Sequence, residues 1–518
     1  MAARNNIRTV FAAALCFSAG VATAGVTFDV DVPKGMLDGE KRGRLVVYLA
    51  SQPNEARGTI SSPVDWDYLH DPMPVYGVDA TLSDDGRVTL DAKSDTFHTA
   101  MDKLPPGTWS AQAVFDHQSV ASSFRMEPGN LLSDAKTFVV AAGDDQVIHL
   151  SLTRVVEPRD YGNSGAEEVK VRSELLSDFA CRDVYLHAGI TLPIDFKPDG
   201  RYAAVYEIPG FGGDRFVAAE DSQQRTRLSR RKDNSPARQL AARTFHITLD
   251  PESPNGHTLF ADSDVNGPYG RAIVEELIPE IEKKYPSLIT ESKARLLKGH
   301  SSGGWAACWL QTQYDSTFGG AWPSSPDPLD FRSFEVIDLY AWENLYVNNG
   351  VEVPSVRNED GEITLRVREE NLWESVVGPK NSGGLQWASW QAVFGLPRGD
   401  GYPKWLWDVR TGAIDKSQLD HYRKYDMSAL LRADPQKYAP IWREKIRLLV
   451  GGMDDYYLDE AVKLISDELA KLPPTGTPET NRGYIKIVPG KTHDTIYETD
   501  EMRQVDQEML DQLDRTQK

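Results

Sequence analysis

The chain has 518 residues, a formal net charge of −20 and three cysteines. This length predicts two or three domains and a sizeable hydrophobic core. A surface this acidic repels phosphate backbones and has no basic footprint, which argues against nucleic acid as a partner.

Residues 1–24 have the pattern of a secretory signal peptide. Arg4 and Arg8 precede an apolar run at 10–21, and the A-T-A at 22–24 fits an A-x-A cleavage site. The run is too short to span a bilayer comfortably, and no later segment approaches the length of a transmembrane helix. We therefore predict a periplasmic or secreted protein without a membrane span.

Two cysteines remain once Cys16 leaves with the predicted signal peptide. Cys181 and Cys308 could form a disulfide in an exported protein, or one of them could be a buried small apolar residue. Two cysteines in a chain this long predict neither a zinc site nor a disulfide framework.

The segment at 25–157 has the pattern of an all-β domain. Short runs of β-branched and aromatic residues are separated by Gly, Pro, Asn and Asp, and no long 3.6-residue period occurs. We predict a β-sandwich of about seven strands with a structural or positioning role. The clearest strands are VTFDVDV, GRLVVYLA, RVTLDA, TWSAQAVFD, KTFVVAA and QVIHLSLTRVV.

A polar stretch at 157–168, rich in charged residues, Gly and Pro, predicts a linker. From residue 158 to 518 predicted strands alternate with predicted helices, which indicates a doubly wound, mostly parallel sheet. The expected strands are DVYLHAGITLPI, RYAAVYEIPGFGG, FHITLDP, ARLLKG, KIRLLVGG and GYIKIVPG. The expected helices are YGRAIVEELIPEIEKKYP, GGWAACWLQTQY and LDEAVKLISDELAKL.

The segment at about 327–438 interrupts this alternation, and we interpret it as a large insertion. It holds half of the chain's tryptophans, which we expect mostly to build the insertion's own core, with a few at the mouth of a pocket. They are Trp342, Trp373, Trp387, Trp390, Trp405 and Trp407.

The stretch GHSSG at 299–303 matches G-x-S-x-G and lies between a predicted strand and a predicted helix. In that context a sharp turn lifts the serine hydroxyl above the sheet, and flanking glycines keep side chains out of the crowded turn. The helix that follows directs its free N–H groups toward the reacting oxygen. Ser301 is therefore the candidate nucleophile.

The candidate base and acid follow late strands. Of the histidines at or after the elbow, only His493 lies on a loop that leaves a predicted strand, whereas His421 lies in the insertion and His300 in the elbow itself. Asp454 lies just after KIRLLVGG, in the run GGMDD, and is the preferred acid, with Asp455 as the alternative. A buried carboxylate that accepts from the imidazole fixes its tautomer and stabilises the imidazolium.

Two backbone N–H groups must stabilise the oxyanion. Ser302 follows the nucleophile and supplies one. The second donor is expected in the glycine-rich turn IPGFGG after an early strand, where Phe211 is the candidate. An ordinary tight turn is the alternative for this segment.

The motifs IPGFGG, GPYGRAIVEELIPEIEKKYP, GHSSGG, GGMDD and PGKTHD together resemble the esterase D, feruloyl esterase and enterochelin esterase branch of the α/β-hydrolases. The resemblance covers roughly residue 168 to the C-terminus, without most of the insertion. It implies Ser301, His493 and Asp454 as a catalytic triad. It also implies oxyanion donors at Phe211 and Ser302, although members usually carry a bulkier residue than Ser302 after the nucleophile.

We therefore expect an α/β-hydrolase domain behind an all-β sandwich, acting as an exported serine esterase. The substrate would be a small-molecule or polysaccharide-linked ester, such as a carbohydrate-linked or phenolic one. An acyltransferase that uses a sugar hydroxyl, a non-catalytic carbohydrate-binding protein and, more remotely, a peptidase remain alternatives.

No cofactor and no metal is expected. The run DSDVNG at 262–267 begins like a calcium loop, D-x-D-x-N-G. Its twelfth position is Ile273, where an EF-hand needs a bidentate Glu, so the motif is incomplete.

Overall fold

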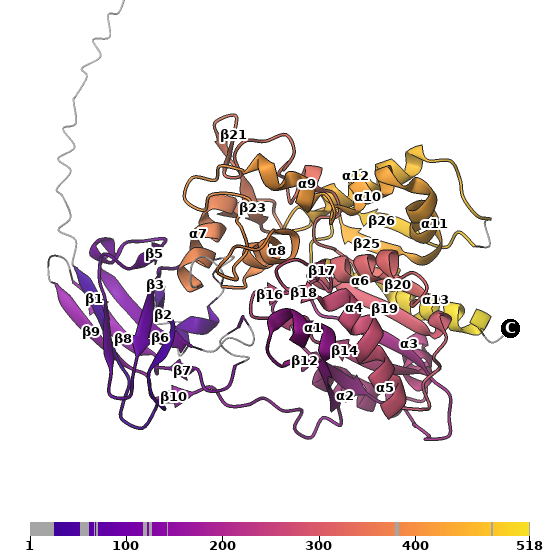
Figure 1. Cartoon of the computed structure of the whole chain (residues 1–518), viewed down its shortest axis with the longest axis horizontal. Helices are drawn as coiled ribbons and strands as arrows, with labels where there is room; N and C mark the ends of the chain where they lie inside the picture. Colours follow the sequence, from indigo (N-terminus) through magenta and orange to yellow (C-terminus); the bar gives the residue numbers. More distant parts are fainter. Residues whose placement is uncertain are drawn as a thin grey trace, which may run out of the picture.

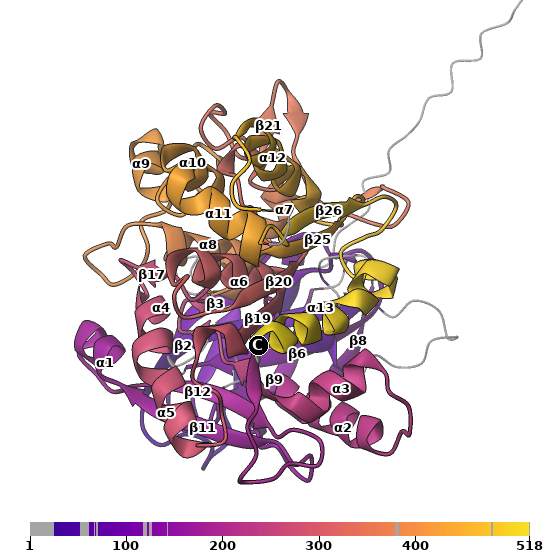
Figure 2. The same cartoon turned by 90° about the vertical axis from the view of Figure 1, so that its right-hand side faces the viewer.

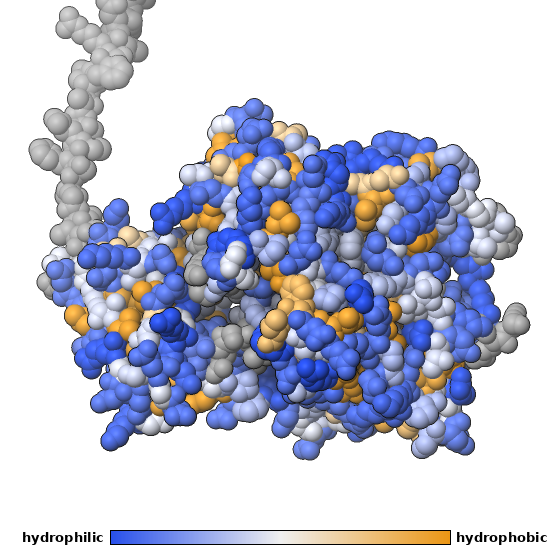
Figure 3. Space-filling view, in the orientation of Figure 1, coloured by the Kyte–Doolittle hydropathy of each residue, from blue (hydrophilic) through white to orange (hydrophobic). Residues whose placement is uncertain are grey.

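The computed structural model shows a β-sandwich and a larger α/β part lying side by side, joined by an extended segment (Figure 1). The predicted signal peptide at 1–24 lies outside the described residues and stays a prediction. The structure describes residues 25–51, 62–66, 68, 71–117, 122–123, 127–141, 143, 145–378, 383–477 and 480–516. Hydrophilic residues cover most of the face in Figure 3, as the acidic composition requires.

The sandwich consists of two sheets, in the strand orders β4-β1-β9 and β10-β7-β6-β2-β3-β5, and β8 also pairs with β6. Buried side chains of both sheets, among them Phe28, Tyr76 and Phe115, share one core. The strands are β1 (Val26–Asp31), β2 (Lys41–Ser51), β3 (Val75–Leu82), β4 (Arg87–Leu90), β5 (Asp95–Phe97), β6 (Gly107–Asp116), β7 (Leu131–Leu132), β8 (Lys136–Val140), β9 (Gln146–Ser151) and β10 (Arg154–Val155).

Eight strands form the central sheet of the α/β part, in the order β11-β12-β14-β13-β19-β20-β25-β26. β12 runs antiparallel to both of its neighbours, and the pairs from β14 to β26 are parallel. The strands are β11 (Glu167–Ser173), β12 (Val184–Thr191), β13 (Ala203–Ile208), β14 (Thr244–Leu249), β19 (Arg295–His300), β20 (Gly320–Ser324), β25 (Arg447–Gly451) and β26 (Tyr484–Val488).

Helices cover both faces of this sheet (Figure 2). Leu240 of α3 (Pro236–Arg243) and Leu510 of α13 (Asp500–Thr516) share a cluster with Leu296 of β19 on one face. On the other face Leu297 clusters with α5 (Ile278–Lys284), α6 (Ser302–Gln313) and α12 (Leu458–Lys471). Consecutive residues of a strand point to opposite faces, so one hydrophobic strand supplies both clusters.

The chain before β19 contains further elements. They are α1 (Glu174–Ala180), α2 (Val217–Ser229), β15 (Glu252–Ser253), β16 (Gly256–His257), β17 (Asp262–Ser263), β18 (Gly267–Pro268), α4 (Tyr269–Ala272) and a π-helical turn (Ile273–Leu277) that leads into α5.

A long insertion separates β20 from β25. Trp387 packs against Trp390 and Trp407, with ring centroids 5.1 and 5.5 Å apart. These rings belong to the same hydrophobic cluster as the central sheet, so they extend the domain core instead of building a separate one. The insertion contains β21 (Val347–Asn348), β22 (Val351–Glu352), β23 (Pro354–Arg357), β24 (Ile363–Arg366), α7 (Val367–Val377), α8 (Gln386–Phe394), α9 (Leu419–Tyr422), α10 (Met427–Ala433) and α11 (Pro435–Lys445).

The two remaining cysteines are free thiols, with Cys181 exposed and Cys308 buried. The disulfide alternative is therefore not realised, and Cys308 is the buried small residue of the other alternative. Within the described part of the chain, no helix is both long and apolar enough to cross a bilayer.

The insertion docks on the sandwich through α7 (Figure 1). Val376 of α7 packs among buried side chains of the sandwich, including Val75 and Phe97. The Arg44 guanidinium, 3% exposed, donates to the Val376 carbonyl oxygen over 2.9 and 2.8 Å. The same group pairs with Asp79, so one side chain ties the sandwich to α7.

We predict that Arg44→Met lowers the free energy of unfolding by about 1–3 kcal/mol, because it leaves a buried carbonyl without its donor. Urea denaturation of the whole chain measures this change. Arg42→Met is the control, since this neighbouring side chain is exposed. Equal destabilisation by both substitutions would contradict the docking role of Arg44.

Candidate active site

The turn between β19 and α6 places Ser301 in a strained backbone conformation, with φ 57° and ψ −126°. A positive φ is uncommon for a residue with a side chain. A Cβ at Gly299 would lie 2.1 Å from the carbonyl oxygen of Gly303, and one at Gly303 would lie 2.0 Å from that of Ile208. Gly299 is therefore required for β19 and α6 to approach this closely, and Gly303 is required for α6 to approach the end of β13.

His493 and Asp454 meet at the same edge of the sheet. Asp454 follows β25 and is fully buried, and its Oδ2 lies 2.9 Å from Nδ1 of His493, which follows β26. Asp455 instead accepts a hydrogen bond from the backbone N–H of His493 over 3.0 Å. Asp454 thus contacts the ring of the candidate base, whereas its neighbour Asp455 fixes the loop that carries the base.

The pair stabilises its own charged forms. Burial by itself would raise the pKa of Asp454, but the charge and hydrogen bond of His493 outweigh it and lower the pKa below its usual value. Burial opposes protonation of His493, yet the charge and hydrogen bond of Asp454 raise the pKa of the imidazole. This arrangement favours the imidazolium that forms when a base accepts a proton.

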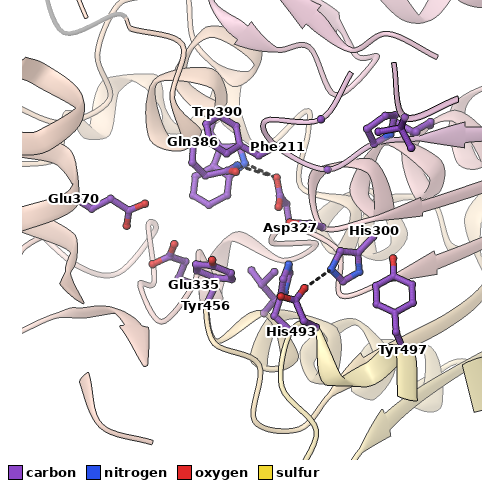
Figure 4. A pocket seen from close by; sticks show the side chains of 18 of the residues that line it. Phe211, His300, Asp327, Glu335, Glu370, Gln386, Trp390, Tyr456, His493 and Tyr497 are labelled. Carbon is purple, nitrogen blue, oxygen red and sulfur yellow. Dashed lines mark hydrogen bonds and ion pairs between the residues drawn. The ribbon is translucent and has the colours of Figure 1, made fainter. Parts of the chain in front are cut away.

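Ser301 and His493 line one cavity of about 480 Å³, a size suited to a small-molecule ligand. Figure 4 shows His493 and Phe211 among the side chains around it. The structure therefore brings the predicted nucleophile, base and oxyanion turn into contact with one space.

The turn after β13 lies directly against the elbow. A Cβ on Gly210 would lie 3.2 Å from the Cβ of Ser301, so this glycine allows the close approach. Phe211, the next residue, lines the cavity, and Ser302 is the first residue of α6, whose first-turn N–H groups lack intrahelical acceptors. Both predicted oxyanion donors thus come from segments that border the cavity.

His257 holds the turn after β13 by a hydrogen bond to Pro209, and the sequence analysis did not single it out. Its Nδ1 accepts from the N–H of Leu259 over 3.0 Å, so Nε2 carries the hydrogen and donates to the carbonyl oxygen of Pro209 over 3.0 Å. Burial lowers the pKa of His257 to about 4, which keeps the ring neutral. No sequence pattern marks this residue, because its partner lies 48 positions away.

Asp327 is a second residue that sequence reasoning missed as a site residue. Its Oδ2 accepts from the Ser302 hydroxyl and from the Trp390 indole N–H, each over 2.7 Å (Figure 4 shows the contact with Trp390). Burial raises its pKa to about 6. Because the Ser302 side chain is held by Asp327, the elbow is fixed from the insertion side. The position of Asp327 just after β20 was the available signal.

His300 packs beside the base. Its ring centroid lies 4.4 Å from that of His493, and its Nδ1 lies 2.9 Å from the Ser324 hydroxyl. Burial and the neighbouring His493 lower the pKa of His300 to about 3. A neutral His300 supports the base sterically without competing for its proton.

The strand order and the elbow together decide the fold. The turn with Ser301 follows the fifth strand of an eight-stranded sheet whose second strand alone is antiparallel, and the acid and base follow the last two strands. The chain has the α/β-hydrolase fold. The candidate nucleophile, acid and base occur in the chain order Ser, Asp, His that this fold requires.

No model of a known protein family matches the chain, and no curated protein matches it either. Solved structures resemble this α/β-hydrolase over about two thirds of its length. A fluorophosphonate-binding serine hydrolase F of Staphylococcus aureus is 13% identical, with a TM-score of 0.36 and coverage of 67% of this chain and 98% of that chain.

A ferulic acid esterase is 14% identical with a TM-score of 0.35, covering 67% of this chain and 98% of its own. An S-formylglutathione hydrolase from Agrobacterium tumefaciens is 11% identical with a TM-score of 0.36, covering 68% and 95%. These proteins are named as hydrolases or esterases. Likeness this distant carries no information on the substrate, which we argue from the site.

The run DSDVNG at 262–267, which begins like a calcium loop, makes contacts within the protein instead. The Asp262 carboxylate accepts from the N–H of Arg271 over 3.0 Å and from the hydroxyl of Tyr314 over 2.8 Å. Within the described ranges, no group of three or more His, Cys, Asp or Glu side chains is placed to hold a metal ion.

The raised pKa of His493 predicts the acid limb of the pH profile. A general base must be neutral, so kcat/KM for an ester should rise with pH through a midpoint above the ordinary histidine value of about 6.5. Asp454→Asn should shift that midpoint downward and lower kcat by about 10³- to 10⁴-fold. Glu498→Gln is the matched control, because it removes an exposed carboxylate close to the base in sequence that does not line the cavity. An unchanged midpoint in Asp454→Asn would contradict the pairing.

Proposed function

We propose that this α/β-hydrolase is a serine esterase that cleaves a carboxylic ester through an acyl-enzyme on Ser301. The observation that supports this most strongly is the buried hydrogen bond between His493 and Asp454. His493 lines the same cavity as Ser301, whose backbone is strained. A nucleophile, an oriented base and two backbone donors around one space are the components of acyl transfer.

In the proposed reaction, Nε2 of His493 accepts the Ser301 proton while the serine oxygen attacks the ester carbonyl carbon. The N–H groups of Phe211 and Ser302 stabilise the resulting oxyanion. As the tetrahedral intermediate collapses, the C–O bond to the alcohol breaks and the imidazolium protonates the departing oxygen. Water then attacks the acyl-enzyme by the same steps, releasing the acid and free Ser301.

Every position that the proposed reaction needs carries a suitable residue. This favours an enzyme over a carbohydrate-binding protein with a degenerate hydrolase domain. A binding protein has no need of a strained serine or of a buried carboxylate that raises the pKa of a histidine. Export and a carbohydrate-linked or phenolic ester stay predictions from the sequence.

Hydrolysis of p-nitrophenyl acetate tests the proposal. Ser301→Ala should lower kcat by about 10⁴- to 10⁶-fold, because it removes the attacking oxygen. Release of p-nitrophenolate measures the rate, and free acetate as the main product separates hydrolysis from transfer to an added alcohol.

Ser325→Ala is the matched control, since this buried serine also has a positive φ, 37°, but does not line the cavity. Equal activity of wild type and Ser301→Ala would end the esterase account.

A further inference from the structure

Glu335 and Glu370 are two of the three buried glutamates that line the cavity from the insertion, and the third is Glu374. Glu335 lies in the chain after β20 and Glu370 lies on α7, and they are 2% and 4% exposed. Both line the cavity, and Figure 4 shows them on the side away from His300 and Tyr497. Neither residue takes part in the reaction proposed for Ser301.

The two carboxylates share one hydrogen-bond donor. The Ser355 hydroxyl lies 3.0 Å from Oε2 of Glu335 and also contacts Oε2 of Glu370. A hydroxyl has a single hydrogen, so it can satisfy only one of them. Oε1 of Glu335 has no hydrogen-bond partner among the described residues, although the side chain is buried.

Among the residues that the structure describes, no cation pairs with these two carboxylates. The described residues that line the cavity include neither Lys nor Arg, and no ion pair within 4.0 Å involves Glu335 or Glu370 among them. Burial, reinforced by repulsion from Glu370, raises the pKa of Glu335 well above its ordinary value. A cation brought by a ligand would therefore favour the ionised form of this pair, which no described cation of the protein does.

The neighbouring Glu374 shows what a structural carboxylate does in the same helix. Its two oxygens accept from the N–H groups of Trp387 and Ala388, each over 2.8 Å, at the start of α8. Every oxygen of Glu374 is satisfied by the protein itself. Glu374 also lines the cavity, but Glu335 differs from it because Oε1 of Glu335 accepts from no described residue.

Aromatic side chains line the cavity together with the two glutamates. Trp373, Trp390 and Tyr456 line the same cavity. Carboxylates combined with aromatic faces bind ammonium groups by charge, hydrogen bonding and cation–π attraction. A neutral hydroxyl could accept or donate hydrogen bonds here, but it could not neutralise two buried acids.

We propose that Glu335 and Glu370 form a subsite for a protonated amine carried by the ester substrate. This inference rests on the proposed esterase function, since the subsite selects among esters that reach Ser301. The substrate class is therefore an ester with an ammonium group, such as an aminoacyl ester.

Matched p-nitrophenyl esters test the subsite. Esters of glycine, β-alanine and 6-aminohexanoate carry an ammonium group, and those of propionate, butyrate and heptanoate replace it with a methyl group. For at least one length, wild-type kcat/KM should favour the cationic ester by about tenfold or more. Several lengths are used because the reach from Ser301 to the glutamates sets the optimum.

Substitutions of the two glutamates test whether they cause the preference for the cationic ester. In Glu335→Gln and in the double variant with Glu370→Gln, the ratio of the cationic to the neutral ester should fall towards one. Glu359→Gln is the matched control, because it removes an exposed carboxylate of the same insertion outside the cavity and should keep the wild-type ratio. A ratio that survives in both subsite variants would overturn the assignment to these residues.

A measurement on the wild type is independent of how the variants fold. Hexylammonium should inhibit hydrolysis of the propionate ester more strongly than 1-hexanol. Equal inhibition together with no cationic preference, while hydrolysis still depends on Ser301, would overturn the subsite and leave the esterase standing. Absence of any Ser301-dependent hydrolysis would overturn both.

Discussion

The close crossing of β19 and α6 is the constraint on which the site depends. A Cβ at Gly299 would lie 2.1 Å from the carbonyl oxygen of Gly303, so the backbone between β19 and α6 must turn sharply, and Ser301 takes a positive φ. A side chain held in that conformation projects away from the sheet into the cavity instead of into the core. The same approach brings the Gly210 turn against the elbow, so nucleophile and oxyanion donors are positioned together.

The parallel sheet supplies the remaining geometry. Because the pairs from β14 to β26 are parallel, residues that follow these strands collect at one edge, whatever their separation in sequence. Asp454 and His493 follow neighbouring strands and meet there, and burial in this position makes their hydrogen bond strong. The insertion closes the space above that edge and adds the carboxylates of Asp327, Glu335 and Glu370.

Much of this could be predicted from sequence, because the relevant signals are short and local. Ser301, His493 and Asp454 each follow a hydrophobic run that reads as a strand, and the glycine pattern marks the elbow. The strands β11 and β20 were missed, since EEVKVRS begins inside a polar stretch and GAWPS contains a proline. The roles of His257, Glu335 and Glu370 depend on contacts between distant segments and leave no local pattern.

The sandwich acquires a role through α7. This helix packs on the sandwich near Val376, and it also carries Glu370 and Trp373 to the cavity wall. Trp373 also stacks on Tyr68 of the sandwich, with ring centroids 6.0 Å apart. The N-terminal domain thus holds in place a wall of the site to which it contributes no predicted catalytic residue.

Covalent labelling with a fluorophosphonate tests the central claim most directly, because the reagent reports the activated hydroxyl itself. Peptide mapping by mass spectrometry should find one adduct per chain, on Ser301, and labelling should be strongly slowed in His493→Ala. An adduct on another residue, or labelling of Ser301 at the same rate without the imidazole, would contradict the proposed relay.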